Sequence, residues 1–196
     1  MSPEPGRVPT DAQILALHRQ HAPTPEAFEL VYTHCRIVCA IAEQLLRRRA
    51  HSLDADLVRA GCLLHDVGVY RLGQDHYLRH GVLGDQLLRE AGWPDRLARF
   101  CSHHTGVGLS RDDVTTQRLP LPVADYLAET AEEELVMYAD KFHSKTTPPV
   151  FVSADTYAAR VRRFGADKVA RFAALRETFG EPDLAPLIDH YGHALV

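Results

Sequence analysis

A histidine and an aspartate stand next to each other at the end of an apolar segment. His65 and Asp66 follow residues 57–64, which are apolar apart from Arg59, and Gly68 supplies a helix-ending signal two residues later. Adjacent helical residues point about 100° apart, so the two side chains cannot share one face, yet both can reach metal ions placed beyond the helix end. The alternative for an isolated pair of this kind is a capping aspartate beside a core histidine.

Other histidines and aspartates are spread over the chain at about one group per predicted helix. His34 is flanked at helical spacing by apolar residues, so its imidazole is expected to face the core. One inward ligand from each helix of a bundle can meet the others at a common point. The candidates are His34, His65, Asp66, His76, His80, His103, His104, Asp140 and His143. The remaining histidines are expected at the surface: His18, His21, His51, His190 and His193.

The spacing of apolar residues is helical almost throughout, which predicts an all-α protein. Helices are expected over residues 25–49, from 52 or 54 to 66, and over 77–91, 94–104, 131–145, 153–164, 166–179 and 182–191. Residues 106–123 carry two prolines and are expected to form an irregular surface loop. Residues 150–152 give the only strand signal.

Composition restricts the classes of protein to consider. With 196 residues and 45% hydrophobic content, the chain is expected to form one globular domain whose core needs no disulfide. The formal net charge is −4 and the basic residues are scattered, which argues against extended nucleic-acid binding but allows a small anionic ligand. No apolar run approaches about 18 residues, so we expect no membrane span. Residues 1–12 are expected to be a tail rather than a signal peptide.

The cysteines indicate the compartment. Cys35, Cys39, Cys62 and Cys101 form no Cys-x-x-Cys pair, and three of them fall on apolar helical stretches. They predict reduced core thiols and a cytoplasmic protein. Cys35 and Cys39 lie one turn apart beside His34, which leaves a zinc site there as an alternative.

The order His34, His65-Asp66, Asp140 resembles the HD-domain superfamily of metal-dependent phosphohydrolases. LLHDVG at 63–68 resembles the family's LLHDIG motif, and RHGVLG at 79–84 resembles the His-x-x-Gly segment of dinuclear members. HTG at 104–106 resembles a segment of the bacterial diadenosine tetraphosphate hydrolase branch. The resemblance covers about residues 28–145. It implies a helical HD-domain bundle at 24–147, between a tail and short helix at 1–23 and a C-terminal helical extension at 148–196 packed on the bundle.

The resemblance also implies a dinuclear metal centre. One ion would be held by four side chains, His34, His65, Asp66 and Asp140, and Asp66 would bridge to a second ion held by His80 and His104. His76 is the alternative to His80, and His103 is the alternative to His104. Imidazole with carboxylate suits iron, which is favoured here, or manganese, nickel, cobalt or zinc. Two such ions would share a bridging hydroxide and clamp a phosphoryl oxygen for in-line attack.

The chain departs from the family in one respect. Many members have a lysine shortly after the HD pair that contacts phosphate, whereas residues 67–71 here are VGVYR. Arg79 and Lys141, each adjacent to an implied ligand, are therefore expected to act with Asp66 in catalysis. Arg71, His103, His143 and Ser144 are expected to contact the substrate. Lys145 is expected nearer the rim, and the arginines of 160–163 on a solvated helix face.

The implied function is hydrolysis of a phosphate ester or anhydride, with a small nucleotide-like anion as the substrate. The alternative is an HD-type mixed-valence diiron oxygenase that cleaves a C–C or C–P bond. The two differ in the pocket, because a hydrolase needs cations that face phosphate. A third alternative is a regulatory module that metal only stabilises. Such a module would be expected to lack some of the metal ligands, whereas all six implied ligands are present here. The sequence leaves homodimer formation open.

Overall fold

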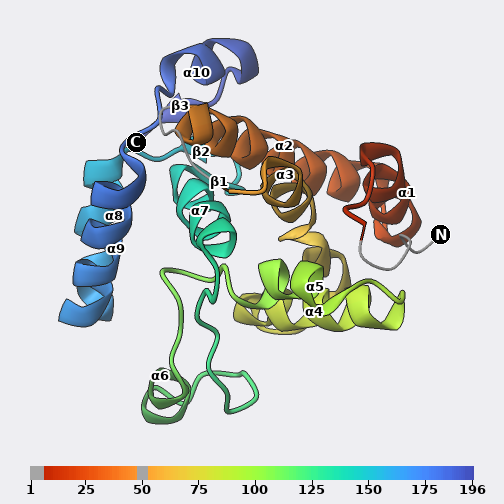
Figure 1. Ribbon diagram of the computed structural model, residues 1–196, viewed down its shortest axis with the longest axis horizontal. Helices are drawn as coiled ribbons and strands as arrows, with labels where there is room; N and C mark the ends of the chain where they lie inside the picture. The colour runs from red at the N-terminus through yellow and green to blue at the C-terminus, as the bar shows by residue number, and fades with distance from the viewer. Residues whose placement is uncertain (1–6, 48–52) are drawn as a thin grey trace.

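The computed structural model describes residues 7–47 and 53–196, and it is largely helical (Figure 1). The first half contains α1 (Asp11–His21), α2 (Pro25–Arg47), α3 (Ala55–Leu64), η1 (Val67–Arg71), η2 (Tyr77–Arg79), α4 (His80–Glu90) and α5 (Asp95–Ser102). The second half contains α6 (Arg111–Thr116), α7 (Ala131–Ala139), η3 (Asp140–Phe142), β1 (His143–Ser144), β2 (Val150–Phe151), α8 (Ala154–Val161), η4 (Arg162–Phe164), α9 (Ala166–Phe179), α10 (Ala185–Tyr191) and β3 (Ala194–Leu195). The predicted all-α class is confirmed.

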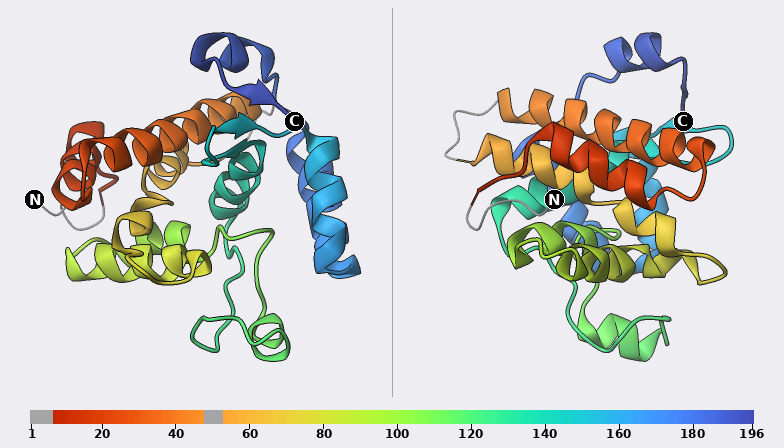
Figure 2. Two further views of the ribbon diagram at one scale, coloured as in Figure 1. Left: turned by 180° about the vertical axis from the view of Figure 1, so that it is seen from behind. Right: turned by 90° about the vertical axis from the view of Figure 1, so that its right-hand side faces the viewer.

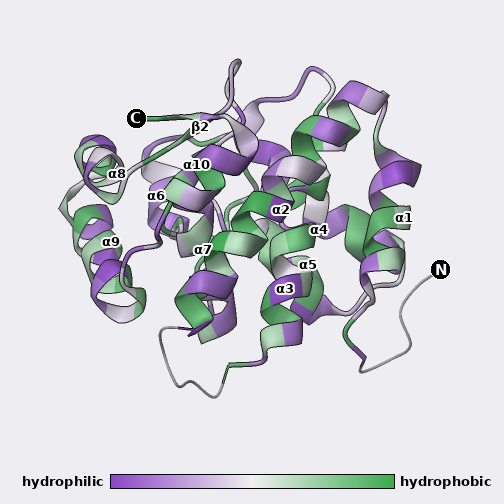
Figure 3. Cartoon of the chain, turned by 90° about the horizontal axis from the view of Figure 1, so that it is seen from above, coloured by the Kyte–Doolittle hydropathy of each residue, from purple (hydrophilic) through white to green (hydrophobic). Residues whose placement is uncertain are grey.

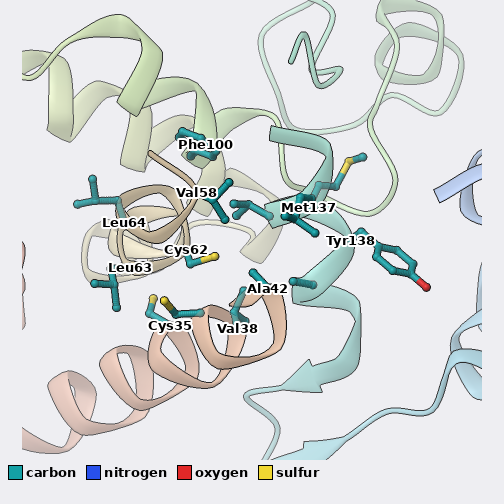
Figure 4. Packing of buried hydrophobic residues seen from close by; sticks show 14 of the residues in the cluster. Cys35, Val38, Ala42, Val58, Cys62, Leu63, Leu64, Phe100, Met137 and Tyr138 are labelled. Carbon is teal, nitrogen blue, oxygen red and sulfur yellow. The ribbon is translucent and has the colours of Figure 1, made fainter. Parts of the chain in front are cut away.

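Helix α3 lies at the centre of the bundle and packs against α2, α5 and α7. Residues 60–64 of α3 are all buried, and Figure 4 shows Cys62 facing Cys35 and Val38 of α2. Figure 3 shows hydrophobic segments gathered where α2, α3, α5 and α7 meet. The four cysteines are buried and free, as expected of core thiols. The core therefore holds the C-terminal end of α3 in a fixed place, and His65 and Asp66 follow at that end.

The segment that carries Asp140 differs from the expected long helix over 131–145. Helix α7 ends at Ala139, and the chain continues through the 3₁₀ turn η3 into the extended strand β1. Strand β1 pairs antiparallel with β2, and β2 pairs parallel with β3 near the C-terminus. This change of backbone conformation turns the side chains after Asp140 away from their helical positions.

Three other segments differ from the sequence-based expectations. The expected loop at 106–123 contains α6, and the arm that carries α6 projects from the bundle in Figures 1 and 2. An antiparallel bridge between Leu109 and Tyr126 joins the two sides of this arm. The helix expected from residue 77 begins with η2. Within the expected tail, α1 already begins at Asp11 behind a Thr10 cap. The proposed start at Ser52, the helix end at 48–49 and His51 lie outside the described residues.

Candidate metal centre

Six side chains from five segments converge at the end of α3. His34 comes from α2, and His65 and Asp66 follow α3. His80 begins α4, His104 follows α5, and Asp140 begins η3. Three overlapping groups of these residues place one potential ligand atom each within 4.8 Å of the others: His34, His65 and Asp66; His65, His104 and Asp140; Asp66, His80 and His104. The groups found among the described residues contain no cysteine, so the alternative site at Cys35 and Cys39 does not form.

The first half of the cluster surrounds His34 Nε2. This atom lies 3.1 Å from Asp66 Oδ2, 3.0 Å from Asp140 Oδ1 and 3.2 Å from His65 Nε2. His65 Nε2 is 3.5 Å from each of the same two carboxylate oxygens. Two imidazole nitrogens and two carboxylate oxygens thus face one point, which is a suitable donor set for a transition-metal ion.

The second half of the cluster contains His80 and His104, whose Nε2 atoms are 2.9 Å apart. Each Nδ1–H donates to a main-chain carbonyl oxygen, of Tyr77 for His80 and of Cys101 for His104, at 2.7 Å. With the ring proton on Nδ1, both Nε2 atoms carry lone pairs. Two lone pairs at this distance repel each other unless a cation lies between or beside them. The pair therefore fits a metal ion.

Asp66 connects the two halves through its two carboxylate oxygens. Oδ2 faces His34 and His65, whereas Oδ1 faces His80 at 3.6 Å and His104 at 3.8 Å. Oδ1 is buried and has no hydrogen-bond partner among the described residues. A buried carboxylate oxygen without a partner is costly, and a metal ion beside His80 and His104 would satisfy it. The residues present thus fit a bridging carboxylate between two ions.

The charge states of the cluster also suit metal binding. Burial would raise the pKa of Asp66, but Lys145, His65 and His34 outweigh burial and hold it well below its usual range. Asp140 behaves in the same way, with Lys141 as its main cationic neighbour. Burial lowers the pKa of His104, and the charges of His65 and His80 lower it further. Both carboxylates are therefore ionised at neutral pH, while His104 remains a neutral ligand.

His65 has the opposite shift. Burial would lower its pKa, but Asp66 and Cys35 outweigh burial and raise it well above the usual value. The carboxylates thus attract a positive charge to the middle of the cluster. A metal ion would provide that charge and displace the proton.

A chain of imidazoles leads from the cluster toward the surface. His34 Nδ1 lies 2.8 Å from His143 Nδ1, and His143 Nε2 lies 3.0 Å from His193 Nδ1. Burial lowers the pKa of His143 to about 2, helped by the charges of His34 and His193, so this ring is neutral. His193 is half-buried and stacks on His143, which corrects its expected place among the surface histidines. The separation of 50 residues concealed this contact in the sequence.

His18 is a second correction among the surface histidines. It is fully buried, and its ring nitrogens lie 2.7 Å from the Leu63 carbonyl oxygen and 2.8 Å from the Tyr70 hydroxyl. The ring joins α1 to the end of α3 and to η1. His18 therefore supports the segment that carries His65 and Asp66 without belonging to the ligand cluster. His21 and His190 were also expected at the surface. His21 is half-buried and His190 is exposed.

Lys145 is the site residue that the sequence did not reveal. It was expected nearer the rim, but its ammonium group forms an ion pair with Asp66 Oδ2 and lies 5.9 Å from the ring centroid of Tyr77. Strand β1 causes the difference, because the extended backbone after Phe142 turns Lys145 inward. Burial would lower the pKa of Lys145, but Asp66, Tyr77 and Asp140 raise it, so the group stays charged.

The other predicted cations pair with acidic groups, and of these only Lys141 lines the cavity described below. Lys141 is buried and donates to Asp140 Oδ2 at 2.8 Å and to the His104 carbonyl oxygen at 3.0 Å. Arg79 pairs with Asp75 at 3.2 Å, and Arg71 pairs with Glu90 at 2.6 Å. Neither arginine lines the cavity described below.

The alternative ligands also lie apart from the cluster. His103 Nδ1 faces Glu133 at 3.6 Å. His76 caps η2 by accepting the Leu78 N–H at 3.2 Å. Adjacent residues of a helix end point in different directions, so only His104 of the pair 103–104 reaches the centre.

A cavity of about 370 Å³ opens over the cluster. Asp66, His80, His104 and Asp140 line its floor, and His143, Ser144 and Lys145 line one wall, so two of the predicted substrate contacts are at the cavity. The C-terminal extension supplies further wall residues, namely Tyr157, Arg160, Val161, Arg163 and Phe164. The arginines 160 and 163, expected on a solvated face, thus lie at the cavity.

The family assignment rests on a comparison of the sequence. The HD-domain family model matches residues 31–145, which is more than half of the chain and contains all six candidate ligands. The chain belongs to the HD-domain family. No helix among the described residues is long and apolar enough to cross a membrane.

Several known proteins are similar to this chain. The uncharacterized protein MJ0778 of Methanocaldococcus jannaschii is 38% identical over 115 residues, which is 57% of this chain and 65% of that protein. A tRNA (cytidine(56)-2'-O)-methyltransferase of Picrophilus torridus is 32% identical over 70% of this chain and 37% of that protein. The chain thus spans less than two thirds of the length of these relatives.

The structural comparison concerns the fold. The HD domain of the phosphodiesterase PgpH of L. monocytogenes superposes with a TM-score of 0.53 at 16% identity, over 91% of this chain and 98% of that domain. The same domain in complex with cyclic-di-AMP superposes with a TM-score of 0.52. The specific likeness to the diadenosine tetraphosphate hydrolase branch is not tested by these relatives.

Proposed function

We propose that this protein is a metal-dependent phosphohydrolase that cleaves a phosphate ester or anhydride of a small nucleotide. The observation that carries the proposal is the position of Asp66, whose two oxygens face two separate sets of ligand atoms. We propose His34, His65, Asp66 and Asp140 as ligands of one ion, and Asp66, His80 and His104 as ligands of the other. Iron is our first candidate, and manganese, nickel, cobalt and zinc share the same ligand preferences.

The chain supplies the remaining parts of the mechanism. When bound, the metal ions would activate water and polarise a phosphoryl oxygen. Lys145 would move from Asp66 to a non-bridging phosphate oxygen, because its ammonium group lies beside Asp66 at the cavity and stays charged. Lys145 thus takes the role that was expected of Arg79 or Lys141. Lys141 would hold Asp140 and the His104 segment in place, and Ser144 and His143 would line the substrate path.

The comparisons support a nucleotide substrate at the level of the fold. A solved HD domain with the same fold holds cyclic-di-AMP. The relatives named as tRNA methyltransferases match over 37% and 41% of their length. We infer that the similarity reflects a shared HD domain, since all six proposed ligands fall within the matched region 31–145.

The cations of the cavity favour phosphate hydrolysis over oxygenase chemistry. Lys145, Arg160 and Arg163 all line its walls. A phosphorylated substrate uses such cations to offset its charge, as in other phosphoryl-transfer sites. An oxygenase that cleaves a C–C bond of an uncharged substrate has no such requirement.

Phosphate release from nucleotides by the metal-loaded protein, with and without oxygen, tests the proposal. We expect release that needs metal and is unchanged without oxygen. Lys145→Ala is expected to lower kcat/KM by about ten-fold or more with unchanged metal content. The matched control is Arg79→Ala, which removes a cation that pairs outside the cavity and is expected to leave the rate unchanged. Oxygen uptake by the iron-loaded protein without phosphate release would assign the site to the oxygenase class.

A further inference from the structure

Two arginines of the C-terminal extension face the cavity without an acidic partner. Arg160 is an exposed residue near the end of α8, and Arg163 lies in η4. Neither forms an ion pair with any residue of 7–47 or 53–196. By contrast, Lys141 pairs with Asp140 and Lys145 pairs with Asp66. The positive charge of the arginines is therefore available to a ligand.

Their spacing lets both guanidinium groups act on one anion. The residues are three positions apart, and side chains at i and i+3 lie on one side of a helix, most closely where the helix is 3₁₀. A guanidinium group presents parallel N–H donors that match two oxygens of a phosphate. The pair lies outside the matched HD domain, at the wall of the cavity rather than among the metal ligands.

Aromatic side chains complete this side of the cavity. Tyr77 is 52% exposed and Phe164 is 50% exposed, and both line the cavity. No other phenylalanine, tyrosine or tryptophan within the described ranges is among the exposed large hydrophobic residues. Exposed aromatic faces are suitable for stacking with a nucleobase. The Arg163 guanidinium lies 4.6 Å from the centroid of the Phe164 ring, which holds the cation and the ring together.

We propose that Arg160 and Arg163 form a second anion subsite, and that Phe164 beside them receives a nucleobase. This inference rests on the proposed phosphohydrolase function and gives it a substrate class, namely nucleotides that carry at least two linked phosphoryl groups. One phosphoryl group lies over the metal ligands and Lys145, and the neighbouring one lies against the arginines. The cavity volume of about 370 Å³ is at the lower end of small-molecule sites, which suits one nucleotide.

The subsite also has a role in the reaction. The oxygen of water forms a bond to the phosphorus over the metal ligands, and the P–O bond to the bridging oxygen breaks. The electron pair of that bond stays on the bridging oxygen, which leaves with the phosphate held by Arg160 and Arg163. The proton lost by water passes to solvent. The two guanidinium groups thus stabilise the negative charge that grows on the leaving phosphate.

Binding of uncleavable nucleotides tests the subsite separately from catalysis. The probes are AMP and α,β-methylene-ADP, measured by calorimetry with the full-length, metal-loaded protein. We expect the wild-type protein to bind α,β-methylene-ADP about ten-fold or more tightly than AMP. The double substitution Arg160→Gln, Arg163→Gln is expected to remove this preference and to leave AMP affinity and metal content unchanged. Arg162→Gln is the matched control, because Arg162 lies on the same turn but does not line the cavity.

A second substitution separates the base from the phosphates. Phe164→Ala is expected to lower the affinity for α,β-methylene-ADP several-fold and to leave the affinity for inorganic pyrophosphate unchanged. Equal preference for the diphosphate in the wild-type protein and the double variant would overturn the subsite, even if phosphate release from nucleotides is observed. A diphosphate preference that depends on the arginines, in a protein that releases no phosphate, would uphold the subsite and reject the proposed function.

Discussion

Three imidazoles of the centre share one local arrangement. His65, His80 and His104 each donate Nδ1–H to the carbonyl oxygen three residues earlier, at 2.7 Å. The main chain at the end of a helical turn thus selects the tautomer of each ring and leaves Nε2 free for a metal ion. His34 lacks such a carbonyl contact, and His143 takes its place at Nδ1. The orientation of four rings is therefore fixed before any ion binds.

The bridging position of Asp66 leads to a prediction about metal content. Asp66→Ala removes an oxygen from both ligand sets, so we expect the loss of both ions. His80→Ala removes a ligand of the second set only and is expected to retain about one ion per chain. Elemental analysis of protein purified without chelators measures the outcome, with His76→Ala as the control at an exposed histidine. Full metal content in both variants would be incompatible with the dinuclear assignment.

The burial of His18 leads to a prediction about pH. Burial lowers its folded-state pKa to about 4, from an ordinary value of 6.5. Below about pH 6.5 the unfolded chain takes up a proton on this ring and the folded chain does not, so stability falls as the pH drops toward 4. Above pH 6.5 the ring is neutral in both states and has no such effect.

The measurement is the free energy of unfolding between pH 4 and pH 8 in the presence of a chelator. His18→Gln cannot take up the proton, so its stability should fall less steeply in this range than that of the wild-type protein. The difference between the two curves isolates His18 from the other histidines. Parallel curves would show that His18 does not titrate as its burial requires.

At the scale of elements, the contact between η1 and α4 sets the distance between Asp66 and His80. A Cβ atom at Gly68 would overlap the His80 carbonyl oxygen and the Gly84 nitrogen. Glycine at this position thus allows the turn after Asp66 to lie directly on the start of α4. Any side chain here would separate the two segments that carry the second ligand set.

We therefore expect Gly68→Ala to lower the melting temperature by several degrees and to reduce metal content, with the second ion lost first. The control is Gly73→Asn, because Gly73 has open space around it and a φ of +51°, which asparagine tolerates. Thermal unfolding and elemental analysis provide the two readouts. A Gly68→Ala protein that binds metal like the wild type would show that the close approach has no role in the centre.

The members of the candidate ligand cluster could be predicted from the sequence, whereas their surroundings could not. His34 stands out as a polar residue among apolar helical neighbours, and His65 with Asp66 as a polar pair at the end of an apolar segment. Asp140, His80 and His104 were implied by the resemblance to the HD-domain family. Lys145 could not be placed, since periodicity does not show that α7 ends at Ala139 and that the chain then becomes extended. The cavity role of Arg163 depends on how the C-terminal extension packs, which local spacing does not determine.

At the scale of the whole molecule, residues after the matched HD domain line the same cavity as the candidate ligands. Helix α8 packs against η3, which carries Asp140 and Lys141. Strand β3 pairs with β2 beyond α10, and His193 precedes β3. The extension thus contacts the centre at two places, through the cavity wall and through the imidazole chain. The variants of Arg160 and Arg163 test whether this extension selects the substrate or only covers the cavity.

The candidate ligands are far apart along the chain, and this separation has a kinetic consequence. His34 and Asp140 are 106 residues apart, and Asp66 and Lys145 are 79 apart. Contacts that close such long loops form late in folding, after the entropy of the loops has been lost. Metal ions should therefore find few assembled ligands in the transition state and should bind only the native chain.

We accordingly expect saturating metal to slow unfolding and to leave the refolding rate nearly unchanged. Stopped-flow fluorescence of Trp93, the single tryptophan, measures both rates with metal and with chelator. The Asp66→Ala protein should show no effect of metal on either rate. Faster refolding of the wild-type protein with metal would contradict the prediction, because it would mean that the ligands are already assembled in the folding transition state. In this protein the metal would determine how long the native state persists, and the speed of folding would be a property of the chain alone.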